Sequence, residues 1–178
     1  MTTAHPAIPA ANLFTDPRTA IIWLLLRLWL GYTWLTSGIE KFADPTWVGA
    51  DAGKAIGGFF KGAIQSSQGE EATVTGWYAA VLQNVAQPLS GVLTYIIPIT
   101  EVTVGALLIV GLLTGWAALV GTLLNLMFLL AGTLGLNPLM LTFSLLLVAA
   151  WTVAGWWGVD GLRIRRRIAT TTGLPFVS

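Results

Sequence analysis

Long apolar segments constrain this chain more than any other feature of its sequence. Residues 19–37, 89–113, 115–134 and 138–157 are each predominantly apolar over about 20 residues, the length that crosses the hydrocarbon core of a membrane as a helix. The chain is 55% hydrophobic and only 10% charged, whereas about a quarter of the residues of a typical soluble protein are charged. We therefore expect an all-α integral membrane protein.

The connections between these segments predict how the helices are arranged. The turns that separate the last three segments are short, so these helices are expected to be antiparallel neighbours. The segment "RIRRR" after the last helix contains four of the nine basic residues, and positive charge is retained in the cytoplasm. The sequence predicts a four-transmembrane-helix antiparallel bundle, residues 19–162, between a cytoplasmic N-terminal tail, residues 1–18, and a basic cytoplasmic C-terminal tail, residues 163–178.

The outer loop between the first two transmembrane helices, residues 38–88, has two apolar patterns of helical period. One consists of Ile56, Phe59, Phe60, Ala63 and Ile64, and the other of Trp77, Val81, Leu82 and Val85. Each predicted helix is too short to span a membrane, so the two are expected to be interfacial helices in the outer headgroup region. Ordinary loop helices packed on each other are the alternative.

A buried cation in the first apolar segment requires a partner. Arg27 lies in a run of leucine and tryptophan, where a charge costs about 2.5–3.5 kcal/mol on insertion scales. Counting helical rise from the cytoplasmic ends of the segments puts Arg27 at about 12 Å, Glu101 at about 18 Å and Asn125 at about 15 Å. We expect Arg27 to pair with Glu101 and Asn125 to bridge them. This cluster either forms a pocket that binds a quinone or relays a proton, or is a structural salt bridge that fixes helix register.

A second polar group lies at the outer end of the first segment. Glu40 and Lys41 close that segment, Asp44 follows, and Asn137 opens the last segment, so these residues are expected to meet. Lys41 is a candidate receptor for an anion at the outer mouth of the bundle. The alternative is that these charges only reach out to solvent from a helix end.

Cysteine is absent and histidine occurs once, at His5, which limits the redox chemistry open to the chain. Thiolate chemistry is excluded, and no metal, haem or flavin is expected. A redox role would use a diffusible cofactor or one held by a partner. Nothing in the charge pattern predicts a nucleic-acid partner.

Three stretches together resemble the DoxX/DoxD family, and in particular the DoxD-like large subunits of thiosulfate:quinone oxidoreductase. They are "RLWLGYTWLTSGIEKFADPTWVG", "EVTVGALLIVGLLTGWAALVGTLLNLMFLLAG" and "GWWGVDGLRIRRR". The positions that match the family are Arg27, Gly38, Lys41, Trp47, Glu101, Asn125 and Asp160.

The resemblance implies a four-helix bundle in a prokaryotic inner membrane that oxidises thiosulfate to tetrathionate and passes electrons to membrane quinone as co-substrate. A second small, DoxA-like subunit or a homo-oligomer would complete it. We predict that Glu101 donates a proton and that Arg27 orients a quinone carbonyl. The candidate binding residues for quinone or the sulfur anion are Lys41, Asn125, Trp47 and Glu40. A non-catalytic membrane scaffold is the competing interpretation, and a small transporter is a weaker third because no inverted repeat is visible.

Overall fold

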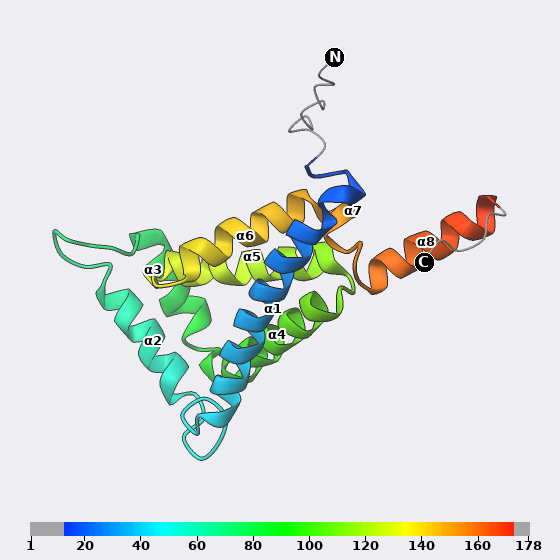
Figure 1. The fold of residues 1–178 in the computed structure, drawn as a ribbon. Coiled ribbons are helices and arrows are strands. Elements are labelled where there is room, and N and C mark those ends of the chain that lie inside the picture. Colours follow the sequence, from blue (N-terminus) through cyan, green and yellow to red (C-terminus); the bar gives the residue numbers. More distant parts are fainter. Residues whose placement is uncertain (1–12, 173–178) are drawn as a thin grey trace.

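The computed structural model describes residues 13–172, and every regular element within that range is helical (Figure 1). The elements in chain order are the 3₁₀ helix η2 (Pro17–Thr19), α1 (Ala20–Ala43), α2 (Lys54–Gln65), α3 (Gly76–Val81), the π-helical turn η3 (Leu82–Ala86), α4 (Ser90–Val110), α5 (Thr114–Leu130), α6 (Asn137–Ala149), α7 (Trp151–Ala154) and α8 (Val159–Thr172).

Two helices are long and apolar enough to cross a membrane by themselves. One is the continuous helical segment Pro17–Ala43, which joins η2 to α1, and the other is α4. Helices α5 and α6 are also apolar but have only 17 and 13 residues. The last predicted segment is interrupted at Ala150, and the chain resumes as the short α7. Trp151 at this break packs against Gly115 of α5, where an added Cβ would lie 2.9 Å from the Trp151 side chain.

The predicted tails differ from the observed structure at both boundaries. Residues 1–12 lie outside the described range, but Leu13 and Phe14 pack on the core, and the Leu13 carbonyl accepts a hydrogen bond from Trp23 Nε1 at 2.9 Å. At the other end, the expected boundary between residues 162 and 163 falls inside α8. Folded structure therefore continues past both expected boundaries, through Leu13 and Phe14 at one end and through the basic residues of α8 at the other.

The loop between α1 and α4 contains the two expected helical segments, although their apolar faces have different surroundings. Ile56, Phe60 and Ala63 of α2 are buried in a cluster with Tyr78 and Leu82. By contrast, Trp77, Val81 and Val85 are exposed. The α2 face therefore follows the alternative of ordinary packing inside the protein, while the exposed face of α3 and η3 remains available for an interfacial position.

Helices α1 and α4 pack closely against each other, and this contact positions the side chains of the candidate site. Glycine permits this approach because a Cβ on Gly105 would lie 2.5 Å from the backbone nitrogen of Leu35. A Cβ on Gly38 would lie 2.9 Å from the Pro98 carbonyl oxygen, and one on Gly31 would lie 3.0 Å from the Gly105 carbonyl oxygen. The two backbones therefore have little freedom to slide past each other.

We expect Gly105→Ala to destabilise the protein strongly, because the new methyl group meets backbone atoms that have no rotamer with which to move away. Gly91→Ala is the matched control on the same helix, since no atom lies within 4 Å of its added Cβ. Alanine there should stabilise by about 0.5–1 kcal/mol through helix propensity. Thermal unfolding of the detergent-solubilised variants measures both effects. Equal melting temperatures for the two variants would contradict the close approach.

Candidate functional site

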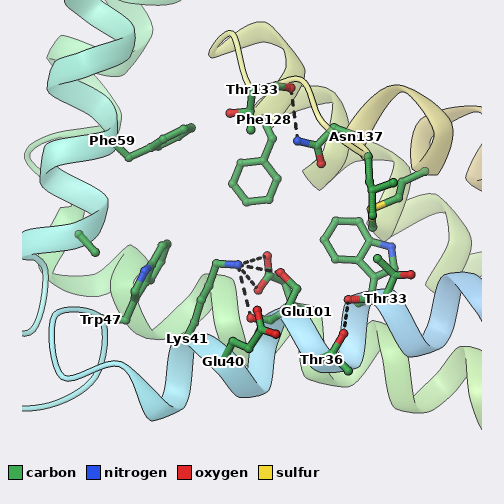
Figure 2. Close-up of a pocket in the computed structure, with 15 residues that line it drawn as sticks. Thr33, Thr36, Glu40, Lys41, Trp47, Phe59, Glu101, Phe128, Thr133 and Asn137 are labelled. Carbon is green, nitrogen blue, oxygen red and sulfur yellow. Dashed lines mark hydrogen bonds and ion pairs between the residues drawn. The ribbon is translucent and has the colours of Figure 1, made fainter.

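A cavity of about 480 Å³ lies beside the C-terminal half of α1 (Figure 2). Its walls come from α1, the following loop, α2, α4, α5 and the start of α6. The lining residues are Thr33, Trp34, Thr36, Ser37, Glu40, Lys41, Trp47, Ala55, Phe59, Glu101, Phe128, Thr133, Leu136, Asn137 and Met140. Four aromatic rings and a small group of polar side chains therefore face one space.

The charged part of the cavity is an ion pair between Lys41 and Glu101. Lys41 Nζ lies 2.9 Å from Glu101 Oε2 and donates a hydrogen bond to Oε1 at 3.0 Å. It also donates to Ser37 Oγ at 2.8 Å. The Glu101 side chain is 1% exposed and that of Lys41 is 19% exposed. The carboxylate is therefore enclosed, whereas the ammonium retains a path to solvent.

Helix register places this pair opposite each other. Gly38 packs against Pro98 and Val102 of α4, and Glu101 lies between these two positions in sequence. Lys41 follows Gly38 by three residues and so projects from nearly the same face of α1. The prediction that Glu101 is buried with a cation was correct, but Lys41 is the partner.

The loop after α1 brings Trp47 beside the ammonium. Asp44 Oδ1 accepts hydrogen bonds from the Thr46 backbone nitrogen at 2.8 Å and from Thr46 Oγ1 at 2.7 Å, which closes a tight turn. These bonds lower the pKa of Asp44 below its ordinary value. The Trp47 carbonyl accepts a hydrogen bond from Thr94 Oγ1 of α4. As a result Lys41 Nζ lies 5.3 Å from the centre of the Trp47 ring, within cation–π range.

The facing wall is aromatic with a polar edge. Phe59 of α2 and Phe128 of α5 contact edge to face with ring centres 6.1 Å apart. Asn137 Nδ2 donates to the Thr133 carbonyl at 3.3 Å, and Figure 2 shows both residues across the cavity from Lys41. Glu40 also lines the cavity, so three residues of the predicted outer polar group, Glu40, Lys41 and Asn137, face one space, whereas Asp44 does not line it.

Arg27 lies elsewhere, and its predicted pairing with Glu101 is wrong. Its side chain is buried, at 1% exposure, and Nη2 donates to the Trp157 carbonyl at 3.0 Å. Arg27 lies about 21 Å from Lys41 along α1, so it cannot share the partner that Lys41 reaches. The depth estimate failed because it assumed that the inner ends of the two segments are level. Gly31, 12 residues into the first segment, packs against Ile109, which is only four residues from the inner end of the second, at position 113.

Glycines form the space that Arg27 occupies. A Cβ on either Gly111 or Gly158 would overlap Arg27 Nη1, and Gly111 has a left-handed φ of 70°. Asp160 is the nearby opposite charge. The cation is thus enclosed by the turn after α4 and the turn before α8, with one backbone carbonyl as its hydrogen-bond acceptor among residues 13–172.

Asp160, in the motif "GWWGVDG", holds the start of α5, a structural role that the sequence analysis did not predict. Its two carboxylate oxygens accept from the backbone nitrogens of Leu113 at 3.0 Å and Thr114 at 2.8 Å, which caps α5 from outside that helix. Its own backbone nitrogen donates to the Gly111 carbonyl at 2.9 Å. Leu113 holds a left-handed φ of 51°, which is strained for a residue with a side chain. The position of this single acidic residue just before the arginines of α8 is the sequence feature that could have indicated the role.

Asn125 does not bridge the charged residues. It is fully buried, and neither its Oδ1 nor its Nδ2 has a hydrogen-bond partner within the described part of the chain. It is also not part of the cavity wall. The bridge was predicted from a common depth with Arg27 and Glu101, and those two residues lie at different levels of the bundle.

Comparison with known proteins identified no relative of this chain. The chain matches no model of a known protein family, no curated protein and no solved structure. Functional reasoning therefore depends on the cavity, the buried charges and the sequence motifs themselves.

Removing one member of the Lys41–Glu101 pair should have unequal effects. Lys41→Met leaves an enclosed carboxylate without its counterion and should cost about 3–5 kcal/mol of unfolding free energy. Glu101→Leu should cost less, because the ammonium can turn toward solvent through the cavity. The double variant should regain much of the stability lost in Lys41→Met. Denaturant unfolding in mild detergent measures this cycle, and a double variant no more stable than Lys41→Met would contradict the pairing.

Asp160→Ala should lower the unfolding free energy by about 1–3 kcal/mol, because two backbone donors at the start of α5 lose their acceptor. Asp51→Ala is the matched control, since Asp51 forms an exposed ion pair with Lys54 of the kind that contributes little. Hydrogen exchange at Leu113 and Thr114 localises the effect. Unchanged protection of these amides in Asp160→Ala would refute the cap.

Proposed function

We propose that this chain is the membrane subunit of a quinone-linked oxidoreductase and that the cavity beside Lys41 and Glu101 receives the quinone head. The observation that carries the proposal is the enclosed Lys41–Glu101 pair at an aromatic cavity. Ligand sites typically have volumes of about 300–1,000 Å³ with apolar walls and a few placed polar groups, and this cavity of about 480 Å³ meets that description.

The apolar surface supports a position in a membrane. Large apolar side chains are exposed along both long helices, including Ile21, Leu25 and Ile39 of α1 and Val92 and Ile99 of α4. Exposed apolar surface on this scale is characteristic of contact with lipid or a partner. In the proposed arrangement α5 and α6 complete a four-helix bundle. The arginines of α8 favour a cytoplasmic location for both termini, in the inner membrane of a prokaryote.

The cavity has hydrogen-bonding groups on opposite sides of its aromatic walls. Lys41 lies on one side and the Thr133–Asn137 edge on the other, with Trp47, Phe59 and Phe128 lining the space between them. A quinone ring has carbonyl oxygens at opposite positions and a flat apolar face. It would stack on the aromatic rings while Lys41 donates a hydrogen bond to one oxygen.

The proposed reaction follows the resemblance to the DoxX/DoxD family. Two thiosulfate anions each lose one electron and join through a new sulfur–sulfur bond, which gives tetrathionate. Quinone gains the two electrons and two protons and becomes quinol. Lys41 stabilises the negative charge that develops on the quinone oxygen. Glu101, a carboxylate in the resting ion pair, takes up one proton from solvent and passes it to that oxygen, and water supplies the second proton. A DoxA-like subunit or a second copy of the chain would complete the thiosulfate site.

A membrane scaffold is the second candidate, and a specific observation favours it. The buried Arg27 and the half-buried Asp160 form contacts between helix ends, and the Lys41–Glu101 pair is complete without a ligand. A protein that docks a partner needs only such internal contacts. The two candidates differ in whether the cavity binds quinone and whether Glu101 titrates during turnover.

Glu101→Gln should abolish thiosulfate-dependent reduction of a short-chain quinone while the protein still assembles, because the amide keeps the shape but cannot take up and release a proton. Glu71→Gln, at an exposed loop position, is the matched control and should retain activity. Labelling with a photoreactive azidoquinone followed by peptide mapping tests occupancy, and it should mark α2 and the loop around Trp47. Activity of Glu101→Gln near that of the unmodified protein would remove Glu101 as proton donor, and labelling elsewhere would favour the scaffold.

A further inference from the structure

A groove of about 350 Å³ lies at the opposite end of α1 from the cavity, between α8 and the start of α5. One face of α8 forms a wall, because Asp160, Arg163, Ile164 and Arg167 fall at i, i+3, i+4 and i+7. Figure 1 shows α8 extending away from the body of the molecule. The remaining lining residues are Leu113, Thr114, Gly115, Trp116, Trp151 and Thr152.

The groove is positively charged on its α8 side. Arg163 and Arg167 lie on its wall, while Arg165 lies on another side of α8 and stacks on Trp156 with its guanidinium 5.6 Å from the ring centre. Asp160 is the acidic residue of the wall, but its two oxygens already accept hydrogen bonds from the start of α5. Two arginines and one carboxylate leave the α8 wall with a net positive charge.

The other wall combines apolar surface with a buried polar group. Trp116 and Trp151 are 63% and 61% exposed, an unusual state for tryptophan except where a lipid or another partner covers it. Tryptophan is enriched at membrane interfaces, where its ring lies at the level of the headgroups. Thr114 Oγ1 is buried in the same wall and has no hydrogen-bond partner within residues 13–172.

We propose that this groove binds one anionic phospholipid, with its phosphate between Arg163 and Arg167 and its acyl chains against Trp116 and Trp151. Arginine suits this ligand because its planar guanidinium donates two hydrogen bonds to a phosphate. A soluble phosphate would use the arginines but leave the two exposed tryptophans uncovered. The proposal depends on the proposed membrane position and is independent of quinone binding in the cavity.

Native mass spectrometry of the full chain in detergent tests the site with three probes: phosphatidylglycerol, phosphatidylcholine and inorganic phosphate. We expect one phosphatidylglycerol to remain bound and to raise the melting temperature, and neither other probe to do so. R163Q/R167Q should weaken phosphatidylglycerol binding roughly tenfold or more, since each basic residue at an anionic surface contributes about fivefold. R18Q is the matched control, because Arg18 is exposed and lies outside the groove.

Two further variants keep the test decisive. R163K/R167K retains the charge and should bind phosphatidylglycerol more tightly than R163Q/R167Q. Trp116→Ala retains both arginines but removes apolar surface, and it should also weaken phosphatidylglycerol binding. These variants also decide the question if R163Q/R167Q does not fold. Equal binding of phosphatidylcholine, or R163Q/R167Q binding like R18Q, would overturn the proposal. Azidoquinone labelling in the same samples should not change, so failure of the lipid site and failure of the quinone site are distinguishable.

Discussion

The close approach of α1 and α4 is the constraint on which the rest of the structure depends. Gly31, Gly38 and Gly105 leave no room for a Cβ between the two backbones, so the helices meet in one register. That register places Glu101 opposite the last turns of α1 and leaves Arg27 beside the turn after α4. Packing therefore decides which charges meet, because a buried ion pair cannot move two interlocked helices by several residues.

The two ends of the bundle use buried charge in different ways. At one end Arg27 donates a hydrogen bond to the Trp157 carbonyl, and Asp160 bonds to backbone groups of Leu113 and Gly111. These contacts join the end of α4, the start of α5 and the start of α8. At the other end Lys41 and Glu101 bind each other beside an open cavity. The first arrangement joins turns of the protein to one another. The second leaves room for a ligand next to a group that can gain or lose a proton.

The residues that carried the family resemblance divide between these two ends. Lys41, Trp47 and Glu101 lie at the cavity, with Gly38 setting the register behind them. Arg27 and Asp160 lie at the opposite end. This division concentrates the chemistry of the proposed oxidoreductase on the Lys41–Glu101 pair, where an ammonium, a carboxylate and aromatic rings meet. Arg27 lies outside the cavity, against Gly111 and Gly158.

The sequence by itself determined the helical class, the approximate helix positions and the need for a partner for each buried charge, because apolar periodicity and the cost of burying ions are local or composition-level properties. It also grouped Glu40, Lys41, Asp44 and Asn137, of which all but Asp44 line the cavity. Only the tertiary structure decided that Glu101 pairs with Lys41 and that Arg27 donates a hydrogen bond to the Trp157 carbonyl. It also decided that Asn125 bonds to neither Arg27 nor Glu101. Those outcomes depend on the relative sliding of α1 and α4, which is set by glycine contacts between residues about 70 positions apart. No pattern within a single helix contains that information.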